Sequence, residues 1–132
     1  MFYNLELIIS GIIFGIILLQ TSVIAPNVFK YLNQNQTRDL LRAVSPKLLL
    51  YILLPASLSL VVSILDNVKF EIQTITALLT VVLSILCYII IPSTNKAKDK
   101  NNQKRFKFLH NLSVTSTFII FLTNLSLVFF NI

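Results

Sequence analysis

The segment Arg105-Phe106-Lys107-Phe108-Leu109-His110-Asn111-Leu112-Ser113 joins a basic stretch, 96–107, to an uncharged apolar run, 108–130. It contains the chain's only histidine, at the point where charged residues give way to hydrocarbon. About 20 apolar residues, each rising 1.5 Å along a helix, cross a hydrocarbon core of about 30 Å. The segment therefore predicts a membrane-spanning helix that begins at a basic membrane surface.

Three further apolar runs have the same character and extend over residues 5–25, 48–65 and 72–91. Glu6 is the only charged residue in the four runs. Hydrocarbon offers no partner for backbone N–H and C=O groups, so each run must be helical. We therefore expect an all-α fold, an integral membrane four-helix bundle with antiparallel up-down-up-down topology. It would form a single domain over residues 1–132.

Composition supports this class, since 55% of the residues are hydrophobic and only 12% are charged. A soluble domain carries about 25% charged residues. The first run has no preceding positive charge and is too long for a cleavable signal peptide, so we expect it to be retained.

The basic residues gather in two of the connections. Segments 26–47 and 92–107 hold four and six of the eleven Lys and Arg residues, whereas the connection around 66–71 holds Lys69 and the termini hold none. Short loops rich in Lys and Arg stay in the cytoplasm. We therefore expect both basic loops inside and both termini outside, in a bacterial-type inner (plasma) membrane.

This asymmetry accounts for the basic charge without a nucleic-acid partner, because topology and contact with anionic lipid both select for it. We expect six basic side chains to contact lipid headgroups, namely Lys30, Arg38, Arg42, Lys104, Arg105 and Lys107.

Prolines set the expected helix ends. Pro26 and Pro92 follow the first and third runs, and proline cannot continue a helical hydrogen-bond ladder. Residues 38–44 predict a short amphipathic helix lying on the inner leaflet. Ser45-Pro46 predicts the start of the second span, and 93–107 predicts mobile coil.

Gly11 and Gly15 form a Gly-x-x-x-Gly pattern in the first run. This spacing lets a second helix approach closely. Inside a membrane, where no hydrophobic effect drives helices together, the close approach allows van der Waals packing to hold them. It predicts a helix-packing face, within the bundle, in a homo-oligomer or in a larger membrane complex.

Polar side chains near the inner ends of the runs suggest a pocket, formed by Gln20, Thr21, Tyr51, Cys87, His110, Asn111 and Ser113. An ionisable group at membrane depth is a functional candidate by default, and histidine titrates near neutral pH. The alternative is a histidine that extends to the interface and bonds a loop carbonyl. Glu6 is expected at the outer edge, where it stays hydrated, which argues against a monomeric proton pump.

Further polar side chains form stripes along 72–91 and 108–130. They predict either interhelical hydrogen bonds or the lining of a polar path.

No motif for catalysis stands out. One His and one Cys fall short of the three or four ligands of a zinc site, and one His supplies at most one axial haem ligand. The sequence has no Gly-rich phosphate loop and no Ser/His/acid set. We therefore expect no metal and no cofactor, and the sequence favours a non-enzyme.

Two stretches carry a family resemblance. Phe106-x-x-Leu109-His110-x-x-Ser113 resembles the opening of the last span in the four-span membrane family that includes the cisplatin-resistance-associated transmembrane protein. Pro26-x-x-Phe29-x-x-Leu32 and Ser45-Pro46 resemble its first inner loop. The chain departs from the family at Asn111, where Gly is common, and at Thr117, where we expect Asn. The resemblance implies a four-helix membrane domain without an established reaction.

Three functions stay open. The preferred one is a non-enzymatic membrane protein that binds a partner protein or lipid, or serves as an accessory subunit. The second is a small oligomeric transporter lined by the polar stripes of the third and fourth spans. The third is a haem-linked redox protein that uses His110.

Overall fold

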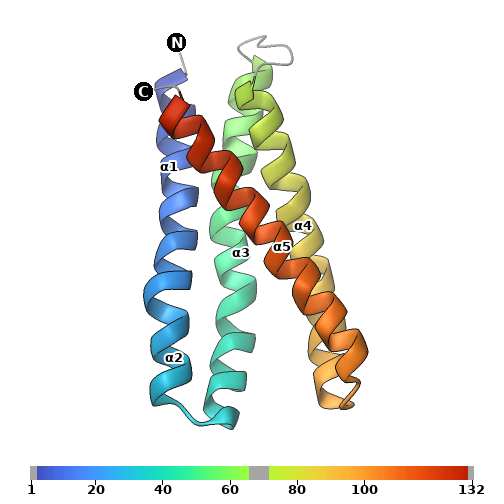
Figure 1. The fold of residues 1–132 in the computed structure, drawn as a ribbon. Coiled ribbons are helices and arrows are strands. Elements are labelled where there is room, and N and C mark those ends of the chain that lie inside the picture. The colour runs from blue at the N-terminus through green and yellow to red at the C-terminus, as the bar shows by residue number, and fades with distance from the viewer. Residues whose placement is uncertain (1–2, 66–71, 131–132) are drawn as a thin grey trace.

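The computed structural model describes residues 3–65 and 72–130, and all regular structure in these ranges is helical. The helices are α1 (Tyr3–Leu19), α2 (Ala25–Tyr31), α3 (Gln34–Leu65), α4 (Ile72–Asp99) and α5 (Gln103–Phe130), and a π-helical turn, Gln20–Ile24, joins α1 to α2 (Figure 1). The connection around 66–71, with Lys69, lies outside the described residues, as do 1–2 and 131–132.

The described helices form four rods, because α1, the π turn and α2 run on from one another. Each rod is long and apolar enough to cross a membrane. Neighbouring rods run antiparallel, and α1 packs on α3 and α5 while α4 packs on the same two helices. The predictions of an all-α fold and of four candidate spans are confirmed.

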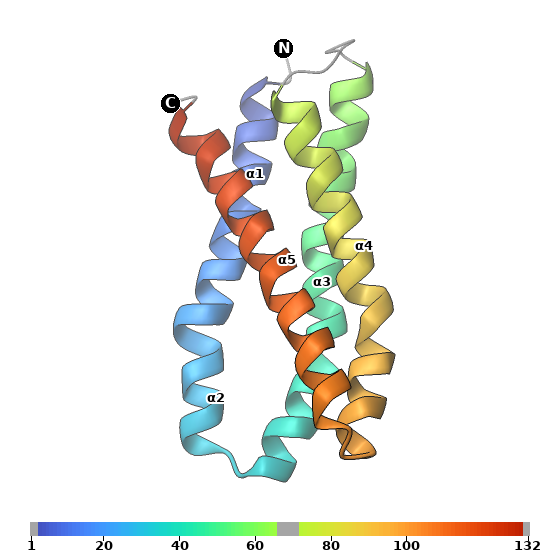
Figure 2. The ribbon, with the colours of Figure 1, turned by 45° about the vertical axis from the view of Figure 1, so that its right-hand side comes forward.

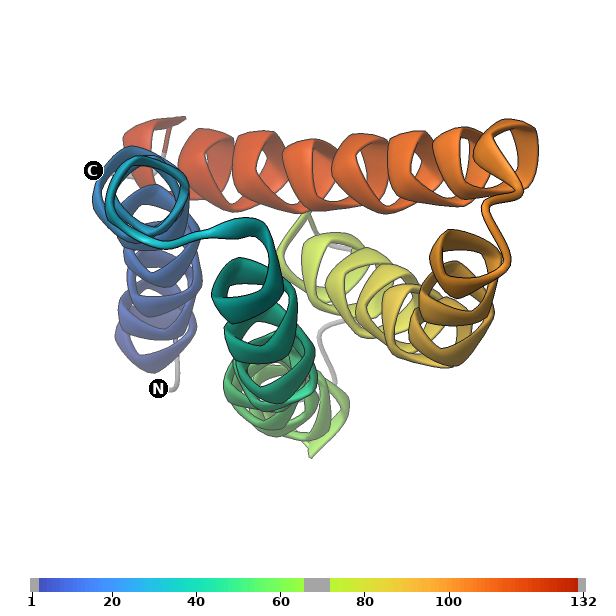
Figure 3. The same cartoon turned by 90° about the horizontal axis from the view of Figure 1, so that it is seen from below.

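Helix α5 crosses the bundle at a slant. Near the chain termini it lies beside α1, and at the opposite end it lies beside α4 (Figures 1 and 2). Seen along the bundle, α5 runs along one side of the other helices, and α2 lies far from the corner where α4 meets α5 (Figure 3). The bundle is therefore less tightly closed at the end opposite the termini, which we call the basic end after Arg38, Arg42 and Lys98.

The outer surface of the bundle is apolar. Ile8, Leu54, Ile64, Ile89 and Phe129 are each more than half exposed, at 59%, 67%, 63%, 64% and 70%. Large aliphatic and aromatic side chains of a soluble domain are mostly buried. An exterior of this kind fits hydrocarbon, and with four candidate spans it is that of a small multi-span membrane protein.

The interior combines an apolar centre with polar side chains. The apolar part is a cluster of Ile9, Ile13, Ile17, Ile52, Ala56 and Ile120, from α1, α3 and α5. The three α1 isoleucines recur every four residues, so they lie on one face of that helix. The cluster fixes α1 against α3 and α5.

The polar stripes of the third and fourth spans meet between α4 and α5. Asn124 Nδ2 donates to Thr80 Oγ1 at 3.0 Å and to the carbonyl of Ile120 at 2.8 Å. Thr80 Oγ1 in turn donates to the carbonyl of Thr76 at 2.8 Å. Only the first of these bonds joins two helices, and an interhelical bond contributes about 0.6 kcal/mol in membranes, so it helps to hold α4 to α5.

The helices do not end at the prolines, and this expectation is wrong. Pro26 lies in α2, Pro46 lies inside α3 and Pro92 lies inside α4. The π turn explains Pro26: Ala25 N–H bonds to the carbonyl of Gln20, five residues back, so the proline falls in the first turn of a new helix, where its missing N–H costs little.

The expected interfacial helix over 38–44 is also wrong, since these residues belong to the long helix α3. A reciprocal cap starts α3 earlier than expected: Gln36 N–H donates to Asn33 Oδ1 at 2.8 Å, and Asn33 N–H donates to Gln36 Oε1 at 3.2 Å. This is the geometry of a capping box. Thus α2 and α3 meet at a tight corner, not a long loop.

The coil expected over 93–107 is wrong for a similar reason. Asn101 adopts a left-handed φ of 54°, and the Asn102 and Asn101 N–H groups bond to the carbonyls of Ala97 and Lys98 at 2.9 and 3.1 Å. These two bonds form a Schellman motif, which closes a helix C-terminus. Asn102 Oδ1 then accepts from the N–H of Arg105 at 3.3 Å and starts α5.

The expected close approach at the glycines does not occur within the chain. A Cβ added at Gly11 or at Gly15 would meet no described atom within 4 Å. The Gly-x-x-x-Gly face is therefore not an interhelical contact of this bundle.

We expect Gly15→Ala to raise the free energy of unfolding by about 0.4–1 kcal/mol, because alanine restricts the unfolded chain and the added methyl group meets no neighbour. Reversible unfolding in mixed micelles measures this change, and Gly11→Ala gives an independent repeat. A loss of stability in both variants, together with loss of an oligomer, would show that a second chain packs on this face.

Candidate functional site

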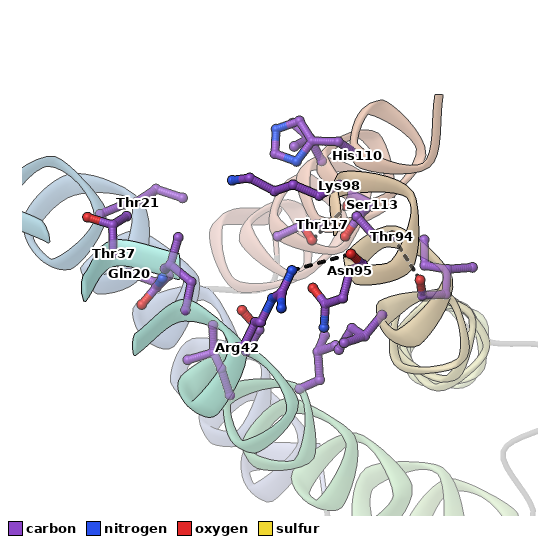
Figure 4. A pocket seen from close by; sticks show the side chains of 18 of the residues that line it. Gln20, Thr21, Thr37, Arg42, Thr94, Asn95, Lys98, His110, Ser113 and Thr117 are labelled. Carbon is purple, nitrogen blue, oxygen red and sulfur yellow. Dashed lines mark hydrogen bonds between the residues drawn. The ribbon is translucent and has the colours of Figure 1, made fainter. Parts of the chain in front are cut away.

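A cavity of about 840 Å³ lies at the basic end, and α1, the π turn, α2, α3, α4 and α5 all contribute to its walls. Figure 4 shows side chains of these elements pointing toward the same space. Small-molecule sites in proteins usually measure about 300–1,000 Å³, so the cavity is of ligand size.

The lining divides into a basic part and an apolar part. Arg38, Arg42, Lys98 and His110 supply the basic groups, from α3, α4 and α5. We call these four residues the basic rim. The apolar wall consists of Ile17, Phe29, Leu41, Leu48, Leu49, Ile90, Ile91, Val114, Phe118 and Phe121. One cavity therefore offers hydrocarbon and positive charge together.

Arg42 connects two helices at the cavity. Its Nη2 lies 2.6 Å from Asp99 Oδ1 and donates to the carbonyl of Asn95 at 3.3 Å (Figure 4 shows the second bond). Both partners lie near the C-terminal end of α4, so the guanidinium joins α3 to α4. The hydrogen bond from Arg42, with that residue's positive charge, holds the pKa of Asp99 below its usual value. The pair therefore stays ionised at neutral pH and is lost only as the pH falls through this lowered pKa.

The other basic groups are less constrained. Arg38 Nε lies 3.4 Å from Asp39 Oδ1, and both side chains are largely exposed, so this pair contributes little. Lys98 Nζ lies 5.5 Å from the centroid of the Phe106 ring, and that ring stacks on His110 at 5.6 Å. Phe106 thus places Lys98 and His110 on the same part of the rim.

The π turn shapes the opposite wall. Thr21 Oγ1 donates back to the carbonyls of Ile17 and Leu18 at 2.9 and 3.3 Å. Gln20 Oε1 is buried and has no hydrogen-bond partner among the described residues. A buried acceptor normally finds a donor, and π turns are common at functional sites. Gln20 therefore carries, beside the cavity, a buried amide oxygen that no described residue satisfies.

The structure brings together four of the residues expected to form a pocket. Gln20, Thr21, His110 and Ser113 all line the cavity. Cys87 is fully buried behind them, with Sγ 3.9 Å from the carbonyl of Ser113, which is a weak contact.

Tyr51 and Asn111 are exposed and do not line the cavity. Each lies next to a residue that faces the core or the cavity, Ile52 for Tyr51 and His110 for Asn111, and adjacent helical residues point about 100° apart. Depth in the membrane could be estimated from the sequence, but the rotation of each helix could not.

The six basic residues expected to contact lipid headgroups fall into two groups. Arg38 and Arg42 line the cavity, whereas the other four are exposed and do not, namely Lys30, Lys104, Arg105 and Lys107. Lys30 instead lies over the ring of Tyr31, 5.3 Å from its centroid.

Sequence reasoning missed Thr94, Asn95 and Lys98, which line the cavity from α4. They follow Pro92, where the sequence predicts coil. The missed signal is helical spacing, since Ile91, Thr94, Asn95 and Lys98 fall at positions i, i+3, i+4 and i+7.

The hydration expected for Glu6 is wrong. Its side chain is buried, at 4% exposure, and its carboxylate accepts a hydrogen bond from the hydroxyl of Ser63 on α3. Glu6 and Ile9 lie on the α1 face that turns inward, because residues three apart share a helix face. The carboxylate thus belongs to the interior at the end of the bundle opposite the cavity.

Within residues 3–65 and 72–130 no three His, Cys, Asp or Glu side chains come close enough to share a metal ion. No protein-family model, curated protein or solved structure matches the chain. The resemblance noted at Phe106 to Ser113 therefore stays a prediction.

Proposed function

We propose that this protein spans the membrane with its basic end in the cytoplasm and binds one anionic amphiphile in the cavity at that end. The observation that carries the proposal is the composition of the cavity, which combines the basic rim with an apolar wall. A lipid has the same two parts, a charged headgroup and an apolar tail.

The orientation supports an inner-leaflet lipid. Both described corners at the basic end, α2–α3 and α4–α5, lie in the Lys- and Arg-rich segments of the sequence, which stay cytoplasmic in membrane proteins. The cytoplasmic leaflet carries the anionic lipids. The cavity would therefore open at the depth where negatively charged headgroups are most abundant.

The rim, more than the wall, would set the selectivity. A lipid tail already lies in hydrocarbon, so moving it against Leu48 or Phe118 changes its solvation little. A headgroup gains charge-assisted hydrogen bonds from an arginine, which are about twice as strong as neutral ones. Anionic lipids should consequently bind more tightly than zwitterionic ones.

The transporter hypothesis is second. Buried polar groups on α4 and α5, such as Thr80, Ser84 and Ser116, would line a path through the bundle. The bond between Asn124 and Thr80 favours a structural role for the same stripe, because it uses the groups that a path would need. His110 stacks on Phe106 at an exposed position, which supports headgroup contact more than haem ligation. We also propose kinship with the four-span family.

We expect the delipidated protein to bind one phosphatidylglycerol per chain, with weaker binding of phosphatidylcholine, as measured by native mass spectrometry. Filling the wall with Val114→Trp and Thr117→Trp should reduce phosphatidylglycerol affinity at least about tenfold, or about 1.4 kcal/mol. Both residues line the cavity from α5, one turn apart.

The matched control is Val82→Trp. Val82 and Val114 are equally exposed, at 53%, but Val82 does not line the cavity. Equal binding by the control and the filled variant, or no preference for the anionic lipid, would refute the proposed function.

A further inference from the structure

The Arg42–Asp99 ion pair places an acidic group where a ligand headgroup would bind. Arg42 lines the cavity, and its Nη2 holds Asp99 Oδ1 at 2.6 Å. Asp99 itself is not part of the cavity lining. One guanidinium of the basic rim is therefore occupied by an acceptor that belongs to the chain.

The Asp99 carboxylate can leave this bond and still be solvated by water. Its side chain is 53% exposed, whereas that of Arg42 is 29% exposed. A carboxylate that is half in solvent regains water when its partner turns away. Arg42 would keep the Asn95 carbonyl as an anchor, at 3.3 Å, while its remaining N–H groups point elsewhere.

The surrounding charges allow an exchange of one anion for another. Arg42, Arg38 and Lys98 all act on Asp99 by their positive charge, so three cations share this one carboxylate. An oxyanion that reached the rim would meet the same field. A guanidinium binds carboxylate and phosphate oxygens with the same fork of donors, so the two anions compete for one site.

We infer that Asp99 is a built-in competitor for the headgroup, and that an anionic lipid binds by taking its place on Arg42. In the lipid-free protein Asp99 neutralises Arg42 and joins α4 to α3. In the bound protein the headgroup oxyanion accepts from Arg42, and Asp99 is released to solvent. A headgroup therefore binds only if it interacts with Arg42 more strongly than Asp99 does, and zwitterionic headgroups do not. This inference rests on the proposed function.

The test measures phosphatidylglycerol binding by native mass spectrometry and by titration into lipid nanodiscs. Asp99→Asn should raise the affinity about three- to fivefold, because the neutral amide competes less well for the guanidinium. Asp99→Glu, which restores the charge, should return the affinity close to that of the wild type. The gain should vanish when Asp99→Asn is combined with Arg42→Gln, since the two residues act through one contact.

The matched control is Asp39→Asn. Asp39 also pairs with an arginine, Arg38, but at 3.4 Å and with a side chain that is 72% exposed. Its neutralisation removes the same charge from the same end of the protein and frees a second rim arginine from only a weak, exposed contact, so it reports the electrostatic effect without the loss of a close ion pair. We expect a change of less than about twofold.

The outcomes separate the two proposals. Wild-type binding of phosphatidylglycerol with equal affinities in Asp99→Asn and Asp39→Asn overturns the exchange and leaves the lipid site standing. Weaker binding in Asp99→Asn, in a variant whose thermal unfolding matches the wild type, also overturns it, because Asp99 would then assist the ligand. No binding by any of the proteins overturns both proposals.

Discussion

Replacing Arg42 with glutamine is expected to weaken phosphatidylglycerol binding by about tenfold or more, because a hydrogen bond to a charged group contributes about 1.5–3 kcal/mol. Arg42 is the best placed cation for this role. It lines the cavity, is less than one-third exposed, and is held in position by the Asn95 carbonyl on α4. Glutamine keeps a polar side chain of moderate length but loses the charge and the fork of donors.

Arg105→Gln is the matched control for this experiment. Arg105 lies in the first turn of α5 at the same basic end, but it is exposed and does not line the cavity. The same charge is removed, so non-specific attraction to an anionic bilayer should fall by a similar amount in both variants. Equal losses in the two variants would assign the effect to the membrane surface and not to the cavity.

The second large effect is expected for stability. Ile120→Ala should lower the free energy of unfolding by about 2 kcal/mol, near the low end of the range for large-to-small core substitutions. Ile120 is fully buried in the apolar cluster with Ile13 and Ile52. Truncation of the side chain leaves a cavity in the core, which accounts for most of the lost stability. Moving the removed methyl groups from the core into lipid costs little free energy, because lipid is also apolar.

The adjacent residue provides the control. Ile119 is 38% exposed on the outer face of the same helix, and it lies outside the apolar cluster. Ile119→Ala should change the free energy of unfolding by less than about 0.5 kcal/mol, because lipid chains fill the space that the side chain leaves. Reversible unfolding in bilayers or mixed micelles measures both variants. Equal losses at the two positions would contradict the packing of α5 described above.

Part of the site could be predicted from the sequence. Gln20, Thr21 and His110 line one cavity, and their shared depth follows from the sequence, because distance from the helix end fixes depth in a membrane, at 1.5 Å per residue. Tyr51 and Asn111 lie at a similar depth but outside the cavity, because depth says nothing of rotation about the helix axis. A shift of one residue turns a side chain by about 100°, away from the cavity.

The helix ends at the basic side differ from the prediction for another reason. A proline predicts a helix end, yet the π turn before Pro26 lets the rod continue. The capping signals were present in the sequence, as Asn33-x-x-Gln36 and Asn101-Asn102, but they fell in segments expected to be coil. Local hydrogen bonds decided these corners, and in doing so placed Thr94, Asn95 and Lys98 on a helix.

The sequence by itself determined that four long uncharged runs must be helices, because hydrocarbon leaves backbone groups no other partner. It also determined that positive charge collects at one end. Only the tertiary structure decided which faces turn inward, that Glu6 is buried against Ser63, and that the slant of α5 leaves a cavity beside Arg42. The physical reason is that helix formation depends on residues within one turn, whereas a helix's rotation and crossing angle are set by side chains that meet from distant parts of the chain.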